Sequence, residues 1–183
     1  MGDTLTTYTG KEMNSFAPTP DMIDIRDIAH ALSLEARANG HYEYFYSVAQ
    51  HCIQCCREAI ARHYVPRLAL ACLLHDGSEA YMSDVTAPLK KYMTMYLQIE
   101  KQLQDMIYEK FLGYVPEGEE MKLIRNIDSA CKYYEAKHFY HREEGTAPYM
   151  LTTLSFKKQH MADVEQEFLE LYRQLIEAMA EED

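Results

Sequence analysis

The sequence predicts an all-α protein, a compact bundle of about six to eight helices. The chain of 183 residues contains only seven glycines and six prolines, which are few for an all-β fold. Long stretches are rich in Ala, Leu, Met, Glu, Lys and Gln, the residues that favour helices. Alternation of polar and apolar residues, the sign of a strand, never extends beyond a few residues.

The first helix is bounded by local signals. Residues 1–24 are expected to be irregular, because two prolines would interrupt a helix there. A carboxylate suits a helix N-terminus, so the helix is expected to begin near Asp24 or Asp27. An Asn-Gly pair is a stop signal and predicts an end at about residue 38.

The later helices follow from the same kinds of signal. Apolar residues recur at helical spacing after Ser47 and predict a helix to about His63. Pro66 is tolerated in a first turn and opens the next helix, which ends at His75. Glycine, proline and polar turns bound the remaining helices, expected at residues 78–82, 93–112, 117–143 and 157–181.

Length and charge limit the classes of function. A chain of this size suits one domain spanning residues 1–183. The net charge of −11 argues against a nucleic-acid partner. Neither a long apolar run nor a signal-peptide pattern is present, so we expect a cytoplasmic protein without a membrane partner. A homo-oligomer is expected.

The cysteines are expected to be reduced. Their number is odd, and they are Cys52, Cys55, Cys56, Cys72 and Cys131. The first three resemble half of a zinc site, but no second pair follows. Because they continue the apolar face of a predicted helix, we interpret them as core thiols.

Chemistry concentrates in residues 70–81, which read LACLLHDGSEAY. His75 and Asp76 end the apolar run, and a buried imidazole beside a carboxylate is costly without a partner. A divalent metal accepts both imidazole nitrogen and carboxylate oxygen. A mononuclear site needs about four protein ligands. His51 upstream and Asp128 downstream, both in predicted helices, complete such a set.

The order His, His-Asp, Asp resembles the HD superfamily of metal-dependent phosphohydrolases. The flanking runs DIAHALS, FYSVAQH and HDGSEAY resemble its small single-domain branch of 5′-deoxynucleotidases and phage deoxynucleoside triphosphohydrolases. The resemblance covers roughly residues 5–140. It implies an HD-type fold, a small nucleotide as substrate and one divalent transition metal ion, such as Mn, Co, Ni, Fe or Zn.

The resemblance also implies roles around the metal. Glu79 would orient or deprotonate the attacking water. Asp84 would lie beside the sugar and the leaving oxygen. Arg37 would hold phosphate oxygens with its guanidinium fork, and Lys90 and His41 are further candidates for the phosphate side. Each has a structural alternative: a helix N-terminal charge for Glu79, a loop cap for Asp84 and a surface charge for the cations.

Several points stay open. Glu135, seven residues after Asp128, lies on the same helical face, where it could contact a metal ligand or form a structural ion pair. The substrate could be a deoxynucleoside 5′-monophosphate, cleaved to nucleoside and phosphate, or a triphosphate, cleaved to nucleoside and triphosphate. The alternatives to this function are a non-catalytic nucleotide-binding module on an HD fold and a hydrolase of a signalling nucleotide.

Overall fold

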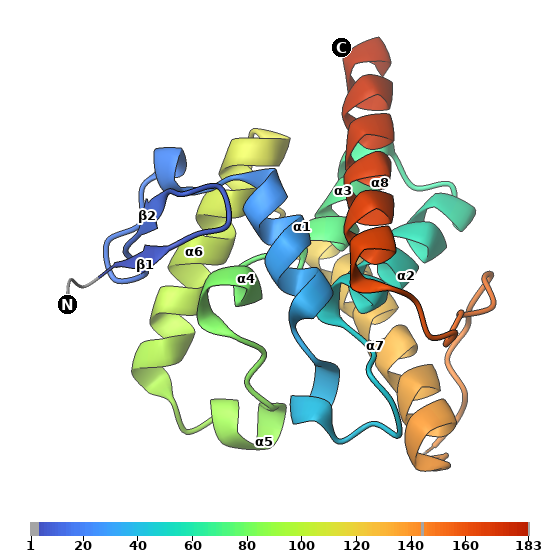
Figure 1. Cartoon of the computed structure of the whole chain (residues 1–183). Helices are drawn as coiled ribbons and strands as arrows, with labels where there is room; N and C mark the ends of the chain where they lie inside the picture. Colours follow the sequence, from blue (N-terminus) through green and yellow to red (C-terminus); the bar gives the residue numbers. More distant parts are fainter. Residues whose placement is uncertain (1–3, 144, 183) are drawn as a thin grey trace.

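The computed structural model describes residues 4–143 and 145–182, and most of these residues are helical (Figure 1). The prediction of an all-α fold is confirmed. The α-helices are α1 (Ile25–Leu34), α2 (Val48–Ala61), α3 (Pro66–Leu74), α4 (Glu79–Met82), α5 (Ala87–Lys90), α6 (Thr94–Leu112), α7 (Gly118–Tyr140) and α8 (Met161–Glu182). None of the helices in the described ranges is both long and apolar enough to cross a membrane.

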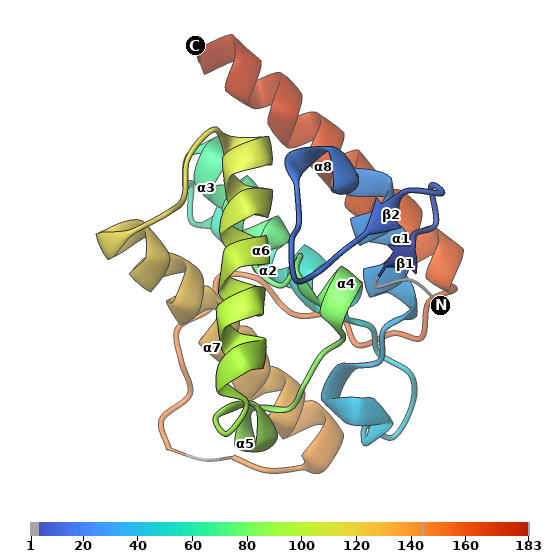
Figure 2. The same ribbon diagram turned by 90° about the vertical axis from the view of Figure 1, so that its left-hand side faces the viewer.

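Almost every side chain along helix α2 is buried, which shows that α2 lies at the centre of the bundle. Ser47 and Gln50 form a capping box at its N-terminus, which fixes where the helix begins. Helices α1, α3, α7 and α8 all pack against α2, and α8 also packs against α1 and α3. The C-terminal end of α8 extends beyond the other helices in both views (Figure 1, Figure 2). The buried apolar side chains form one continuous core.

The N-terminal segment differs from the irregular chain predicted for residues 1–24. Strands β1 (Leu5–Thr6) and β2 (Glu12–Met13) form a small antiparallel hairpin, and a 3-10 turn follows at Pro20–Met22. Strands of two residues are too short to show an alternating pattern in the sequence. Asp27 is not the helix cap: its carboxylate accepts hydrogen bonds from the backbone and hydroxyl of Thr9, at 2.6 and 2.9 Å, and ties the hairpin to α1.

The first helix ends at Leu34, four residues before the predicted position. The backbone N–H of Arg37 donates to the carbonyl of Tyr46, and Ala36 forms a β-bridge with Ser47. The chain after Leu34 is therefore extended to pair with the segment before α2. This pairing, which local sequence signals do not reveal, carries the Arg37 side chain into the interior.

Three further predictions differ from the structure. Helix α7 ends at Tyr140 and not at residue 143. The segment expected to be a loop between residues 83 and 92 contains the short helix α5. The last helix begins at Met161 instead of residue 157, because residues 153–160 have no regular secondary structure and are held against α2 by hydrogen bonds. Gln54 Nε2 donates to the Ser155 carbonyl at 3.0 Å, and Gln50 Nε2 reaches Gln159 at 3.1 Å.

Candidate metal centre

The four predicted metal ligands converge at one point. His51 lies on α2, His75 and Asp76 follow the end of α3, and Asp128 lies in the middle of α7. His51 Nε2 is 3.2 Å from His75 Nε2, 3.0 Å from Asp128 Oδ1 and 3.9 Å from Asp76 Oδ2. His75 Nε2 is 3.3 Å from Asp76 Oδ2 and 3.5 Å from Asp128 Oδ1. The fold therefore brings together three separate segments of the chain.

Hydrogen bonds at the far ring nitrogens orient both imidazoles. His75 Nδ1 lies 2.8 Å from the carbonyl oxygen of Cys72, which can only accept, so Nδ1 carries the proton. His51 Nδ1 lies 2.5 Å from Glu135 Oε1 and donates to it in the same way. In their neutral forms both rings then turn an unprotonated Nε2 toward the same point. Two lone pairs 3.2 Å apart repel each other unless positive charge lies beside them.

The electrostatics of the cluster also require positive charge. Burial lowers the pKa of His75, but Asp76 and Asp128 outweigh burial and hold that pKa well above its ordinary value. Burial and Arg37 lower the pKa of His51, yet carboxylates raise it overall. Burial raises the pKa of Asp76 and Asp128, but the imidazoles hold both carboxyls below their ordinary pKa. Either protons on the imidazoles or a metal ion can supply the missing charge.

An unsatisfied oxygen shows that the residues fit a metal ion. Asp76 Oδ2 is buried and receives no hydrogen bond from the described part of the chain, although such groups are costly to bury. It lies within 3.9 Å of both Nε2 atoms. Two imidazoles and two carboxylates are a donor set that divalent transition ions prefer. His51, His75, Asp76 and Asp128 would hold such an ion.

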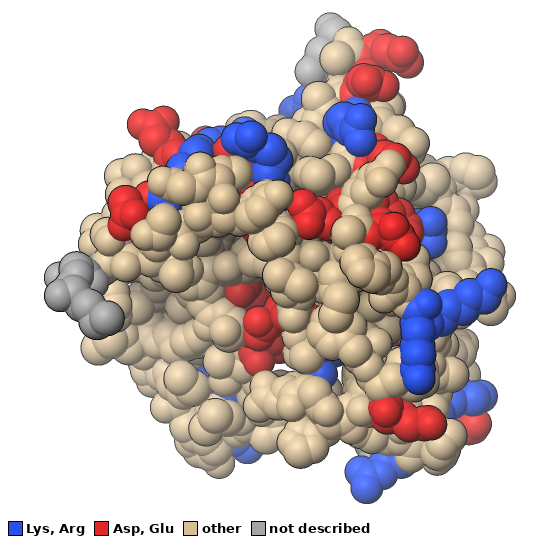
Figure 3. Space-filling view, viewed as in Figure 1, with Lys and Arg blue, Asp and Glu red and all other residues tan. Residues whose placement is uncertain are grey.

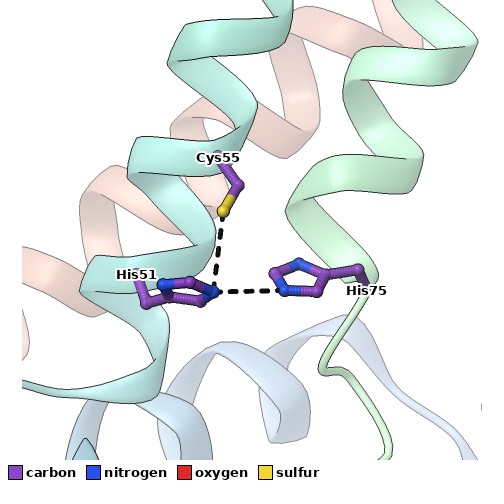
Figure 4. Close-up of side chains that lie close together, drawn as sticks. All are labelled: His51, Cys55 and His75. Carbon is purple, nitrogen blue, oxygen red and sulfur yellow. Dashed lines mark hydrogen bonds between the residues drawn. The ribbon is translucent and has the colours of Figure 1, made fainter. Parts of the chain in front are cut away.

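Cys55 also borders the cluster, one turn after His51 on α2 (Figure 4). Its Sγ lies 3.6 Å from His51 Nε2, and potential ligand atoms of His51, Cys55 and His75 all lie within 4.8 Å of one another. Cys52, His75 and Asp76 form a second group of this kind. Burial holds the pKa of the Cys55 thiol well above its ordinary value, and a protonated thiol is a poor ligand. We therefore favour the ionised carboxylates as ligands. All five cysteines are buried and free, as expected of core thiols.

Glu135 contacts the candidate ligand His51 and also forms an ion pair with Arg37. Its Oε2 accepts hydrogen bonds from Arg37 Nη2 and the Tyr42 hydroxyl, each at 3.2 Å. Burial raises the pKa of Glu135, but His51 and Arg37 outweigh this and lower it to about 2. The buried carboxylate is therefore charged and fixes the orientation of the His51 ring.

Arg37 is buried rather than on the surface. Besides Glu135, its guanidinium approaches Asp76 Oδ2 at 3.5 Å and Asp84 Oδ2 at 3.8 Å. Its Nε is buried without an acceptor among the described residues. Arg37 thus links a candidate metal ligand to Asp84, whose side chain faces the same space.

Glu79 and Lys90 form an ion pair beside the cluster. Lys90 Nζ on α5 lies 3.4 Å from Glu79 Oε1 in the first turn of α4, and it also pairs with Glu100 on α6. Burial, Asp76 and other nearby carboxylates raise the pKa of Glu79 well above its ordinary value. Its Oε2 is buried and has no hydrogen-bond partner among the described residues. The raised pKa makes the Glu79 carboxylate a stronger proton acceptor than an ordinary carboxylate.

His41 is the one predicted site residue that the fold does not bring to the cluster. The backbone has positive φ at Ala38 (53°) and Asn39 (51°), and this turn leads the chain away from the interior. His41 follows at the end of the 3-10 turn Arg37–Gly40 and is exposed. No described contact joins it to the cluster, so the structure gives no support for a role on the phosphate side.

Two cavities meet at the cluster. The larger, of about 770 Å³, is lined by His75, Asp76 and Asp128 together with side chains of α6 and the start of α7. The smaller, of about 300 Å³, is lined by Arg37, Asp84 and other residues. Asp76, Glu79 and Lys90 line both cavities. Figure 3 shows a hollow in one face of the molecule with acidic side chains inside it.

Sequence reasoning assigned no role to three residues that shape this site. Gln104 on α6 clamps the turn after α3: its Nε2 donates to the Leu74 carbonyl at 2.8 Å, and its Oε1 accepts from the Ser78 N–H at 3.0 Å. Gly77 is required in this turn, because a Cβ there would lie 2.9 Å from the Leu74 carbonyl oxygen. Lys132 Nζ lies 2.7 Å from Asp128 Oδ2. The spacing of four residues from Asp128 could have revealed Lys132, whereas nothing local reveals Gln104.

The fold and the cluster define an all-α protein with a buried group of imidazoles and carboxylates. No protein-family model matches the chain. It is 39% identical over 106 residues to the Uncharacterized protein YfdR of Escherichia coli K12, a match covering 57% of this chain and 56% of YfdR. It is 32% identical over 136 residues to the Uncharacterized protein RCAP_rcc00048 of Rhodobacter capsulatus, covering 70% of this chain and 69% of that protein. The chain belongs to the same family as RCAP_rcc00048.

Proposed function

We propose that this protein is a divalent-metal-dependent phosphohydrolase of the HD type that acts on deoxynucleoside 5′-monophosphates or triphosphates. The observation that carries the proposal is the convergence of two imidazole Nε2 atoms and the unsatisfied Asp76 Oδ2 beside a cavity of about 770 Å³. A cavity of this size suits a small-molecule substrate. We further propose a cytoplasmic homo-oligomer whose partners include neither nucleic acid nor a membrane.

The residues around the cluster have distinct chemical roles in this proposal. When bound, a divalent ion lowers the pKa of water and withdraws charge from a phosphoryl group. Glu79 accepts the proton of the attacking water, for which its buried, unpartnered Oε2 is suited. Arg37 donates to phosphate oxygens, and Asp84 accepts a hydrogen bond from a sugar hydroxyl. Glu135 holds His51 in the orientation that ligation needs.

We favour hydrolysis over binding alone because, among the described residues, Glu79 pairs only with Lys90. A carboxylate kept only to cap α4 would not need burial beside Asp76 and a raised pKa. The non-catalytic binding module and the hydrolase of a signalling nucleotide therefore rank below nucleotide hydrolysis.

The proposal is tested by a substrate panel. Purified protein is supplied with Mn, Co, Ni, Fe or Zn and with deoxynucleoside mono- and triphosphates, and released phosphate and triphosphate are measured separately. We expect one of the two products, and which one appears identifies the bond that is cleaved. The Glu79→Gln variant controls for contaminating phosphatase. Nucleotide binding without any product would replace this proposal with the non-catalytic module.

A further inference from the structure

Three cations line the smaller cavity in the described part of the chain: Arg37, Lys90 and Lys132. Arg37 approaches three carboxylates, and Lys90 pairs with two. The charge of each is already more than balanced by protein groups. Among the residues that the structure describes, Lys132 pairs with a single carboxylate, that of Asp128. Of the three, it has the most charge left to offer a ligand.

The two oxygens of Asp128 face different groups. Oδ1 lies 3.0 Å from His51 Nε2, whereas Oδ2 lies 2.7 Å from Lys132 Nζ. Lys132 therefore stands at the boundary between the candidate metal centre and the smaller cavity. A cation held at Asp128 would share the charge of that carboxylate and weaken its hold on the lysine.

Lys132 is also the most accessible of the three cations. Its side chain is 51% exposed, against 21% for Lys90 and 7% for Arg37. A lysine ammonium has three donors on a flexible stem, so it can keep one hydrogen bond to Asp128 and direct the others at an anion. Arg37 is fixed by its three carboxylates and cannot move in this way.

We propose that Lys132, and not Lys90, is the lysine that binds the phosphate of the substrate. This inference rests on the proposed function and adds a specific binding residue to it. A phosphate in the smaller cavity lies between the fixed guanidinium of Arg37 and the mobile ammonium of Lys132. Lys90 instead pairs with Glu79 on α4 and with Glu100 on α6, and these two carboxylates balance its charge.

The test measures the binding of inorganic phosphate to the manganese-loaded protein by calorimetry. Lys132→Gln should weaken phosphate binding by about tenfold, the effect of losing one charged hydrogen bond, while Lys132→Arg keeps most of it. The control is Lys137→Gln, because Lys137 lies on the same helix, is 47% exposed and pairs with Glu143 away from the cluster. With a nucleotide substrate, Lys132→Gln should raise KM by a similar factor and change kcat less.

Metal content separates the possible roles of Lys132. We expect Lys132→Gln to keep its manganese, as measured by elemental analysis. Loss of the ion in this variant would show that Lys132 only positions Asp128 and would overturn the inference. Unchanged phosphate binding, or a larger loss in Lys90→Gln than in Lys132→Gln, would overturn it as well. If the wild type binds phosphate through Lys132 but hydrolyses no nucleotide, the proposed function fails while the phosphate site stands.

Discussion

Glu135 Oε1 lies 2.5 Å from His51 Nδ1, and both side chains are wholly buried. The carboxylate fixes the tautomer of the ring and leaves Nε2 free to face the other candidate ligands. Arg37 balances the second oxygen of Glu135. Glu135 and Arg37 therefore lie behind His51, and their charges determine which nitrogen His51 presents to the other candidate ligands.

Glu135→Gln should weaken metal affinity by roughly 10- to 100-fold, the usual cost of removing a partner behind a metal-binding histidine. The amide is less able to support a ligating imidazole, because it carries no charge. Competition titration against a fluorescent chelator measures this affinity. Glu119→Gln, at an exposed position on the same helix, serves as the control. Equal affinities in the two variants would show that Glu135 has only a packing role.

The metal content of two purified variants should distinguish a metal ligand, Asp76, from a residue that assists the chemistry, Glu79. Asp76→Ala should lose the ion and the activity together, because it removes a candidate ligand atom. Glu79→Ala should keep the ion and lose activity by about 100-fold or more, the scale of a positioned acid-base group. Elemental analysis of each purified variant, followed by turnover with the same substrate, checks both expectations. Normal turnover by Glu79→Ala would remove Glu79 from the chemistry.

The stability of the metal-free protein should fall as pH rises above about 6.5, the ordinary pKa of histidine. The pKa values of His51 and His75 are raised in the folded state, so their stabilising contribution is complete at lower pH and is lost as the rings deprotonate. Metal competes with these protons, so the gain in Tm on adding the ion should grow over the same range. Thermal unfolding with and without manganese measures both trends. A gain in Tm that does not depend on pH would contradict the histidine assignment.

Glu58 should stabilise the long segment before α8. Its buried carboxylate accepts hydrogen bonds from the backbone N–H groups of Leu151 and Thr152 and from Arg62 Nε. Glu58→Gln should lower the free energy of unfolding by about 2 kcal/mol at neutral pH, because these are hydrogen bonds to a charged group. Urea unfolding measures the change, with exposed Glu109→Gln as the control.

The pH dependence of that effect gives a second check. Burial raises the pKa of Glu58, but its hydrogen bonds to the segment at 151–152 and to Arg62 outweigh burial and lower it. Its contribution is therefore complete above the ordinary carboxyl pKa of about 4.3 and is lost as pH falls through the lowered value. The difference between wild type and variant should shrink in acid. A constant difference at all pH values would mean that shape, and not charge, explains the effect.

Local signals in the sequence were sufficient to predict most of the helices. The capping box at Ser47, the proline that opens α3 and the glycine that ends α6 act within a few residues of the boundary they create. Where a boundary depended on a distant strand or loop, prediction failed. Helix α1 stops at Leu34 because the next residues pair with the segment before α2.

The sequence by itself determined the chemical types of the candidate site, because imidazoles and carboxylates at the ends of apolar runs need a partner wherever they are buried. Whether they bind a metal stays a prediction. Only the tertiary structure decided which charged side chains contact the cluster, which are already paired with other protein groups and which face the solvent. Glu135 reaches His51 across 84 positions in the chain, Lys90 is occupied by Glu79 and Glu100, and His41 is turned out to solvent. The physical reason is that Coulomb attraction and desolvation depend on distance and burial in space, and sequence separation fixes neither.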